Sequence, residues 1–462
     1  MNVYEGDLMS TAELSISPSD LKKLKFWRTS TFFVMLFGYV GYYLCRGNIS
    51  AAFPLMSEAF GYSNEQLGLI AFASELAYAA GKFINGPMGD RIGGRKIFLI
   101  GMLGAIVCNF LFAMGSSLIY FVVIWCVCRY FLSMGWGGLA KVIGNWYEPE
   151  KNGTVMGFIS INFQFGGVVA SLLAGLIVSL GGTWRDVFIY PPLVLILILI
   201  WSYFASKDSP QDVVPGTRFG KSSEGRQSVL KAAEGSVESK TFLDNAKALM
   251  ALPLYRHLLL YSFLTTFLRS VFFFWTPKML VDMGMGTSSA IFKSALFPLL
   301  GCLGTIFIGW YTDHHAKDNR ARMMWIMLSG LVFCLFGISG LAVGTNLSGD
   351  VQSIIVVLLG MSGFFLLGPY SMSSGCLALD IAGPEAAGSC TGIIDGMGYI
   401  GGALAVWLAG RYSDQLGWGQ VFVALGVIAV MATFSAMMMS RGFIKARHLQ
   451  AKGLARKGPP SI

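Results

Sequence analysis

Charged residues are scarce in this chain of 462 residues. Asp, Glu, Lys and Arg together make up 13% of the sequence, whereas hydrophobic residues make up 54%. A soluble globular domain carries about 25% charged residues. The shortage of charge therefore excludes an ordinary soluble protein and indicates a chain that lies largely in lipid.

Metal-ligand and catalytic patterns are also missing. The eight cysteines all fall in apolar segments, and none belongs to a CxxC or Cys/His pattern. We expect them to be small packing residues, and we predict neither disulfides nor a metal site. No ATP-binding loop, Ser/His/Asp arrangement or paired catalytic acid occurs, so we predict no enzymatic activity and no cofactor.

Long apolar runs fill the rest of the chain. Each can cross a bilayer as a helix, and the 57 glycines are typical of helices that pack closely in membranes. We predict an all-α integral membrane protein. The twelve predicted spans are 28–56, 65–87, 96–115, 118–146, 154–180, 186–205, 254–280, 288–311, 322–344, 352–378, 388–410 and 418–440.

The connections between these runs alternate in lysine and arginine content. Basic residues occur in "LKKLKFWR", "DRIGGRK", the stretch 206–253, "DHHAKDNRAR" and the tail from Arg441, whereas 57–64, 116–117 and 345–351 have almost none. The positive-inside rule then places both termini in the cytoplasm. It also explains the net charge of +9, so we predict no nucleic-acid partner.

A polar stretch rich in Ser, Gly and Pro divides the chain into two sets of six spans. It reads as a linker. The predicted units are a cytoplasmic N-terminal segment (1–27), a first half (28–205), the cytoplasmic linker (206–253), a second half (254–440) and a basic cytoplasmic tail (441–462). "SPSDLKKLKFWR" carries a helix N-cap signal and is expected to form a short amphipathic helix on the inner membrane face.

The two halves share an internal repeat. One ungapped shift of 223 residues superposes five pairs of identical residues, as expected of a duplicated transporter. The two halves are therefore predicted to be pseudo-symmetric about an axis along the membrane normal. The matched pairs are Arg46 and Arg269, Pro54 and Pro277, Gly81 and Gly304, Gly86 and Gly309, and Asp90 and Asp313.

Arg46 and Arg269 are the most informative pair. An arginine inside a membrane helix is costly, so it usually marks a functional site. Two guanidiniums at equivalent depths, one in each half, can face each other across a central cavity and bind an anion such as phosphate. The alternative is that each arginine pairs with a carboxylate inside its own half.

The loop motif "GPMGDRIGGRK" (86–96) matches the signature loop of the major facilitator superfamily with one extra glycine, and "GWYTDHHAKDNRAR" (309–322) is a degenerate copy. The resemblance implies a major facilitator fold of twelve transmembrane helices. We expect Gly86 and Gly309 to allow close helix approach, and Asp90, Arg91 and Asp313 to act in gating.

Four further stretches narrow the resemblance. "YVGYYLCRGNISAAFP", "AYAAGKFINGPMGDR", "FLRSVFFFWTPKML" and "GPYSMSSGCLALDIAGPEAAGSCTGIIDGMGYIGG" resemble the organophosphate:phosphate antiporter family. The resemblance implies exchange of a sugar or polyol phosphate for inorganic phosphate by alternating access. It implies that Arg46 and Arg269 hold the phosphoryl group, and that the site also contains Lys82, Tyr39, Tyr43, Tyr78 and Tyr399.

The chain departs from these relatives where they bind the organic part of the substrate. Phe163 stands where the glycerol-phosphate carrier has a histidine, and Gly47 stands where lysine is frequent. Ile394 and Asp395 occupy the region of a helix-11 lysine in the hexose-phosphate carrier, and Pro298 lies near the place of an acidic residue. The resemblance therefore supports the phosphate site but leaves the organic group open.

Four intramembrane charges have no role in this scheme: Glu75, Arg129, Lys141 and Asp395. Lys141 lies near the cytoplasmic end of its span and is expected to extend its ammonium group to the membrane surface. Glu75 could pair with Lys82, Arg129 or Arg46, and Asp395 could balance Arg269 or bind substrate hydroxyls. Arg129 is interpreted as a helix-pairing residue. The alternative for Glu75 and Asp395 is proton coupling.

Three functions stay open from the sequence. The first is an antiporter of organic phosphate against inorganic phosphate, acting as a monomer in a bacterial cytoplasmic (inner) membrane. The second is a membrane receptor of the same fold that senses sugar phosphate. The third is a proton-coupled symporter of an organic anion that uses Glu75 or Asp395.

Overall fold

The computed structural model describes residues 17–147, 155–156, 158–215, 217, 250–315, 319–342, 347–373 and 377–456; the side chains at 87, 90, 313, 378–390 and 446–456 fall outside this description. Within these ranges the chain is helical and contains no strand. This agrees with the predicted all-α class. Most of the predicted linker 206–253 and the last residues of the tail lie outside the described residues.

Fourteen α-helices and one short 3-10 helix form the described structure. Helices of the first half are α1 (Pro18–Phe60), α2 (Asn64–Ile92), α3 (Gly94–Ala113), α4 (Leu118–Leu132), α5 (Met134–Trp146), α7 (Asn162–Ser179) and α8 (Asp186–Ala205), followed by η2 (Pro210–Asp212). Helices of the second half are α11 (Pro253–Asp282), α12 (Thr287–Ser294), α13 (Leu296–His315), α14 (Arg320–Leu341), α15 (Gly349–Met372), α16 (Ala378–Leu416) and α17 (Trp418–Arg456).

Eleven helical stretches of the described residues are long and apolar enough to cross a membrane. The first helix, α1, is not among the eleven, and it carries Arg46 and Asn48 inside its apolar stretch. It nevertheless packs along α7 and α8 of the first half. With α1, the helices account for the twelve predicted spans.

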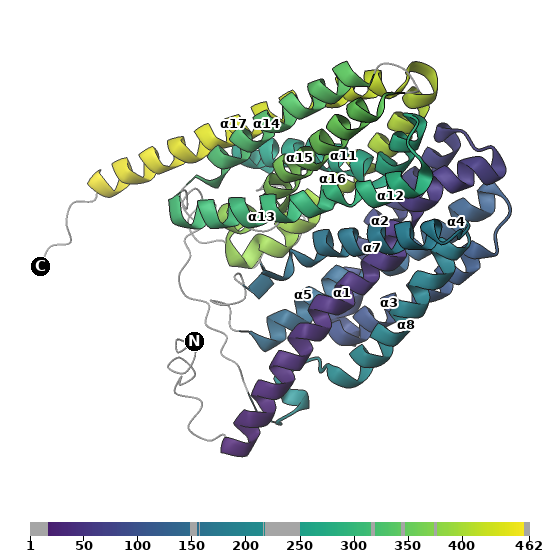
Figure 1. Cartoon of the computed structure of the whole chain (residues 1–462). Helices are drawn as coiled ribbons and strands as arrows, with labels where there is room; N and C mark the ends of the chain where they lie inside the picture. The colour runs from purple at the N-terminus through teal and green to yellow at the C-terminus, as the bar shows by residue number, and fades with distance from the viewer. Residues whose placement is uncertain are drawn as a thin grey trace, which may run out of the picture.

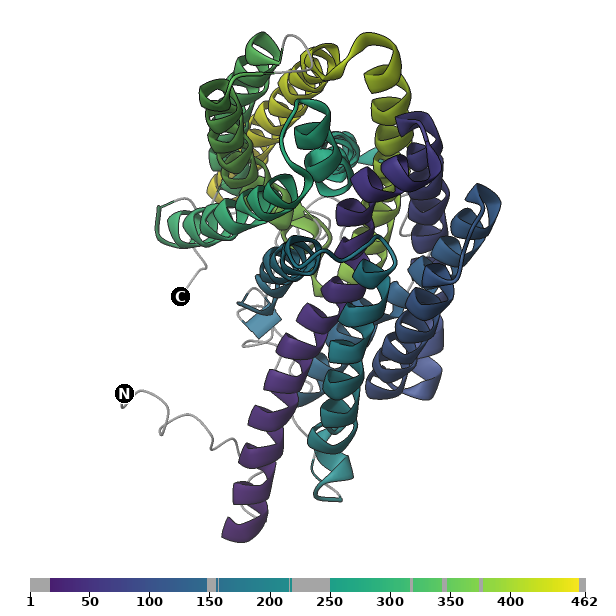
Figure 2. The ribbon, with the colours of Figure 1, turned by 45° about the vertical axis from the view of Figure 1, so that its right-hand side comes forward.

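The helices form two groups that meet along the centre of the molecule (Figure 1). Helices α1, α3 and α8 lie on one side, and α14, α15 and α17 lie on the other (Figures 1 and 2). Contacts between the groups run through α1 with α11, α2 with α16, and α7 with α12 and α13. The Arg46 and Arg269 helices are thus direct neighbours at the interface between the halves.

One pair of repeat glycines makes the same kind of contact in both halves. A Cβ on Gly81 of α2 would lie 2.3 Å from Ser133 Oγ, at the junction of α4 and α5. A Cβ on Gly304 of α13 would lie 2.1 Å from the backbone oxygen of Phe364 in α15. Gly304 therefore needs to be glycine, because a larger residue would push α13 away from the backbone of α15, whereas at Gly81 the Ser133 side chain could move aside.

The expectation for the other glycine pair is wrong in this conformation. A Cβ on Gly86 or Gly309 would meet no atom within 4 Å, so neither glycine supports a close helix contact. Both lie nearer the end of their helix than Gly81 and Gly304, and the neighbouring helices do not approach them.

Three helix boundaries differ from the predicted spans. The basic segment "SPSDLKKLKFWR" is not a separate amphipathic helix, because α1 continues through it without a break from Pro18 to Phe60. Ser17 does act as its N-cap, accepting from the Asp20 N–H. The predicted spans 118–146 and 288–311 are each divided into two helices, at Ser133 and Ala295.

Candidate binding site between the two halves

Arg46 lies near the middle of α1 and is buried. Its guanidinium contacts aromatic groups of its own half: Nη1 donates to the hydroxyl of Tyr78 at 3.3 Å, and the guanidinium carbon lies 4.6 Å from the Tyr78 ring and 5.2 Å from the Tyr43 ring. Its buried Nε has no hydrogen-bond partner. An aromatic cage stabilises a cation without neutralising it.

Arg269 lies on α11 in the second half and is also buried. Its guanidinium carbon lies 4.9 Å from the ring of Tyr370 and 5.9 Å from that of Phe163. No carboxylate of the described residues forms an ion pair with Arg46 or Arg269. The described part of the chain therefore gives no support to the alternative in which each arginine is neutralised inside its own half.

The two arginines share one aromatic neighbour. The guanidinium carbon of Arg46 lies 5.7 Å from the ring centroid of Phe273, and that of Arg269 lies 5.9 Å from the same centroid. The two carbons can be no farther apart than the sum of these distances. Two uncompensated positive charges thus flank one ring at the interface between the halves.

A third cation lies beside them but is paired. Lys82 Nζ lies 2.5 Å from Asp395 Oδ2, which joins α2 to α16 across the interface. The ammonium also lies 5.0 Å from the ring of Tyr399 and 5.7 Å from that of Tyr78. From the sequence we expect Asp395 to balance Arg269 or to bind substrate hydroxyls, but in this structure it pairs with Lys82, a partner that the sequence does not suggest.

Glu75 and Arg129 form a second ion pair, buried within the first half. The Arg129 guanidinium carbon lies 4.5 Å from the ring of Tyr78, on which Arg46 also stacks. Arg129 is therefore a helix-pairing residue, as predicted. Glu75 pairs with Arg129 and with neither Lys82 nor Arg46 among its predicted candidates.

The site tyrosines divide into two groups. Tyr78 and Tyr399 contact each other across the interface, with ring centroids 4.7 Å apart. Tyr39 and Tyr43 lie on α1, and Tyr39 packs against Tyr43 at 5.7 Å and against Trp136 at 5.5 Å. Tyr43 reaches Arg46 directly, whereas Tyr39 contacts the site through Tyr43.

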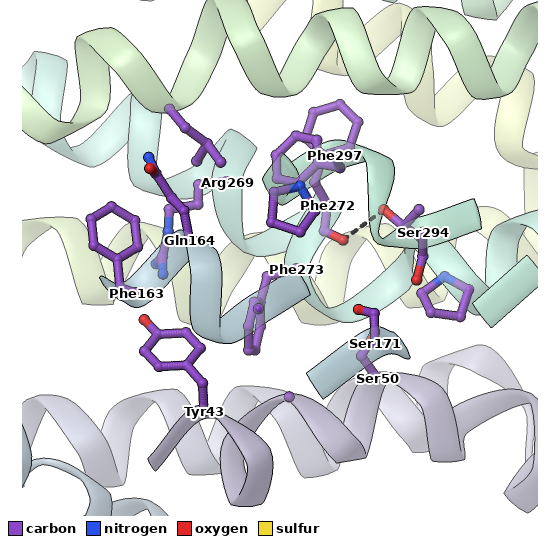
Figure 3. Close-up of a pocket in the computed structure, with 16 residues that line it drawn as sticks. Tyr43, Ser50, Phe163, Gln164, Ser171, Arg269, Phe272, Phe273, Ser294 and Phe297 are labelled. Carbon is purple, nitrogen blue, oxygen red and sulfur yellow. Dashed lines mark hydrogen bonds between the residues drawn. The ribbon is translucent and has the colours of Figure 1, made fainter. Parts of the chain in front are cut away.

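A cavity opens beside Arg269, with about 560 Å³ of unfilled space that is partly open to solvent. Tyr43, Phe163 and Gln164 gather around the arginine, and Phe273 lies between α1 and α11 (Figure 3). The walls come from α1 and α7 of the first half and from α11, α12, α13 and α15 of the second. A ligand in this cavity would contact both halves at once.

A second cavity lies on the other side of the Tyr78–Tyr399 contact. Lys82, Asp395 and Tyr399 line it together with Asn85 and Trp136. Trp136, which follows the junction of α4 and α5, therefore lines this cavity. Arg269 lines the first cavity and Lys82 lines the second, whereas Arg46 lines neither and approaches Arg269 across the Phe273 ring.

Three of the proposed gating residues, Gly86, Arg91 and Gly309, are described in full by the structure, and one of them lines a cavity. Gly86 lines the second cavity. Arg91 is exposed near the end of α2, and Gly309 lies in α13. The side chains of Asp90 and Asp313 lie outside the described ones, so their gating role stays a prediction.

Several lining residues escape the sequence reasoning. Tyr370 and Phe273 contact Arg269, and Gln164 and Ser50 line the cavity. None carries a charge, so none stands out in an apolar helix. Their helical spacing offers a weak signal: Phe273 follows Arg269 by four residues and Ser50 follows Arg46 by four, which places each on the face of its arginine.

Comparison with known proteins places the chain among transporters. It is 28% identical to a probable hexose phosphate transport protein of Chlamydia pneumoniae over 419 residues, covering 89% of this chain and 90% of that one. It is 28% identical to the glycerol-3-phosphate transporter of Bacillus subtilis over 427 residues, covering 90% and 93%. It is 26% identical to the membrane sensor protein UhpC of Escherichia coli, covering 90% and 92%. These names confirm the resemblance to the organophosphate:phosphate antiporter family.

Solved structures support the fold. A bacterial homologue of the human lysosomal transporter Spinster, inward-facing and unoccupied, superposes with a TM-score of 0.72 at 16% identity, covering 91% of this chain and 98% of that one. A D-xylose-proton symporter gives 0.68 at 14% identity, covering 89% and 97%. The family model described as Major Facilitator Superfamily matches residues 35–406. This match indicates a transport protein rather than an enzyme. The chain belongs to the Major Facilitator Superfamily.

Proposed function

We propose that this protein exchanges a phosphorylated sugar or polyol for inorganic phosphate by alternating access, with the phosphoryl group held between Arg46 and Arg269. The observation that carries the proposal is the pair of buried guanidiniums that flank Phe273 without a carboxylate among the described residues. An uncompensated buried cation is costly. A phosphate dianion supplies the missing charge and matches the planar fork of each guanidinium.

The placement of the two arginines links binding to movement. Each half contributes one of them, so a dianion that bridges both is bound best when the halves are close. Inorganic phosphate and a phosphate monoester present the same oxygens, so either can fill the site. Exchange follows if the empty carrier reorients slowly because the two guanidiniums repel each other.

The proposal also includes the membrane in which the protein lies and its orientation there. We place the protein in a bacterial cytoplasmic membrane as a monomer, with both termini in the cytoplasm. The distribution of lysine and arginine supports this orientation. The names of the Chlamydia and Bacillus relatives, a hexose phosphate and a glycerol-3-phosphate transporter, support the substrate class.

Counterflow in liposomes tests the proposal. Vesicles that contain the purified protein and internal phosphate should take up labelled phosphate, and external glucose 6-phosphate or glycerol 3-phosphate should compete. Arg46→Lys and Arg269→Lys should each reduce exchange by about a hundredfold or more, because an ammonium cannot make the bidentate contact. Arg256→Lys is the matched control, since Arg256 is exposed and lies on the same helix as Arg269. Absence of counterflow with phosphate inside would refute exchange.

A sensor of the same fold is the second candidate. The likeness to the membrane sensor protein UhpC favours it, and nothing in the paired arginines distinguishes a carrier from a receptor. Ligand-dependent thermal stabilisation of the purified protein, combined with no flux in liposomes, would assign the chain to this class.

Proton-coupled symport has less support. Its two candidate proton carriers are already engaged, Glu75 with Arg129 and Asp395 with Lys82. Uptake that persists with a protonophore and requires internal phosphate would exclude this function.

A further inference from the structure

The cavity beside Arg269 has two chemically different ends. Arg269, Tyr43, Phe163 and Gln164 occupy one end, whereas three serines from three helices occupy the other (Figure 3). We call the second the serine end; it consists of Ser50 of α1, Ser171 of α7 and Ser294 of α12. These hydroxyl groups come from both halves, so a ligand bound at this end would contact both halves.

Two of these hydroxyl groups already donate a hydrogen bond to a backbone carbonyl oxygen. Ser50 Oγ donates to the carbonyl oxygen of Phe274 at 3.1 Å, and Ser294 Oγ donates to that of Ile291 at 2.6 Å. Both serines are buried. A hydroxyl that donates to a carbonyl keeps only its lone pairs for another partner, so each offers an acceptor to the cavity.

Gln164 adds a further acceptor. Thr305 donates to the carbonyl oxygen of Leu367 at 3.3 Å and accepts from Gln164 Nε2 at 2.6 Å. This chain of bonds fixes which way the carboxamide points. Gln164 is 1% exposed, and its Oε1 has no hydrogen-bond partner. A buried oxygen without a donor is costly, and a ligand that donates a hydrogen bond there would remove the cost.

Aromatic rings connect the two ends of the cavity. Phe272 and Phe297 stack with centroids 4.7 Å apart, and Phe273 lies beside Arg269 (Figure 3). Their faces give an apolar wall on which the C–H groups of a carbon skeleton can pack. The order of the lining is therefore cation, aromatic wall and hydrogen-bond acceptors.

Charge is absent from the rest of the lining. Among the described residues that line this cavity, Arg269 is the one with a formal charge. A second anionic group on the ligand would meet acceptor oxygens and no cation, whereas hydroxyl groups would donate to those same oxygens. This lining therefore favours phosphate esters whose organic part carries hydroxyl groups over those whose organic part carries a second anionic group.

We propose that Ser50 and Ser294, at the serine end, select the organic part of the substrate, and that they select a hydroxyl-bearing group over a carboxylate-bearing one. The preferred ligands are then phosphorylated sugars or polyols, and phosphorylated carboxylic acids are excluded. The inference rests on the proposed function for the phosphate end of the site. It assigns specificity to residues that the phosphate clamp does not use.

Ligand binding to the purified full-length protein tests this assignment. The ligands are inorganic phosphate, glucose 6-phosphate, glycerol 3-phosphate, 3-phosphoglycerate and phosphoenolpyruvate, and the readout is thermal stabilisation over a concentration series. The wild-type protein should bind the sugar or polyol phosphates at least about tenfold more tightly than the two carboxylates. The double variant Ser50→Ala/Ser294→Ala should weaken the sugar phosphate by about tenfold while inorganic phosphate stays within about twofold.

Ser362→Ala is the matched control, because Ser362 is buried and bonds a helix carbonyl but does not line the cavity. It should leave all affinities unchanged. The single variant Ser50→Ala serves as a second test if the double variant does not fold, and it should also weaken only the organic phosphates. Equal binding of 3-phosphoglycerate and glycerol 3-phosphate, or equal weakening of phosphate and sugar phosphate, would overturn the assignment. Loss of phosphate binding in the wild type would instead refute the phosphate site.

Discussion

Lys82 and Asp395 form an ion pair across the interface between the halves, with 2.5 Å between Nζ and Oδ2. Their side chains keep 21% and 19% of their surface exposed, and both line the second cavity. The pair neutralises one of the three cations near the interface and leaves Arg46 and Arg269 uncompensated. Under the proposed function, Asp395 competes with the phosphoryl group for Lys82.

Changing this pair should alter phosphate affinity in opposite directions. Lys82→Met removes a positive charge and leaves the Asp395 carboxylate near the ligand, so phosphate binding should weaken by about tenfold or more. Asp395→Asn frees the ammonium and should tighten phosphate binding while slowing its release. Isothermal titration at one pH and salt concentration measures both. The double variant Lys82→Met/Asp395→Asn controls for coupling, and weaker phosphate binding by Asp395→Asn alone would contradict the competition.

The buried pair of Glu75 and Arg129 should matter for stability. Glu75→Gln leaves the Arg129 guanidinium buried without its carboxylate, which costs about 3–5 kcal/mol when one partner of a buried pair is removed. We expect a marked loss of thermal stability in detergent. The double variant Glu75→Leu/Arg129→Met should recover much of it, because both charges leave together. A stable Glu75→Gln protein that loses proton-dependent uptake would point to coupling instead.

The repeat glycines provide a matched test of helix packing. Gly304→Ala places a Cβ 2.1 Å from a backbone oxygen of α15, and backbone cannot move aside cheaply. Overpacking of this kind costs about 1–3 kcal/mol. Gly309→Ala, five residues later on the same helix, meets no atom within 4 Å and should be neutral or slightly stabilising. Thermal unfolding of both variants decides, and equal melting temperatures would contradict the packing argument.

The sequence predicts the helical spans and the two arginines because both have strong one-dimensional signals. Apolar runs of bilayer length mark helices, and an arginine inside such a run is rare. The shared offset then relates Arg46 to Arg269 without any knowledge of distances. These features depend only on the composition of single helices.

The partners of Asp395 and Glu75 could not be assigned in the same way. Asp395 meets Lys82 only because α16 packs against α2 across the interface. A single sequence does not indicate which helix of one half packs against which helix of the other. The choice of Gly81 over Gly86 as a packing glycine likewise depends on which face of α2 the next helix covers. The serines and Gln164 lack any signal because uncharged residues are common in membrane helices.

The first turn of α2 contacts the second half through hydrogen bonds, and these bonds allow a test of how the two halves move. The carboxylate of Asp414, on α16 of the second half, accepts from the backbone N–H groups of Asn64 at 3.2 Å and Glu65 at 2.9 Å. The N–H of Gln66 is bonded by the Ser63 side chain. A carboxylate of one half thus completes the cap of a helix in the other, at the end of α2 far from Lys82. This bond must break if the halves separate at this end.

Asp414→Ala should therefore shift the protein toward the conformation that is open at this end. A lost helix cap is worth about 1 kcal/mol, which corresponds to a population change of about fivefold. Spin labels on cysteines substituted for the exposed residues Glu58 and Gln415, in a background without the native cysteines, would report the change as a larger fraction of long distances. Arg411→Ala is the control, because Arg411 and Glu65 are exposed and lie 3.8 Å apart; such a surface pair contributes little. An unchanged distance distribution in Asp414→Ala would show that the cap does not hold this end closed.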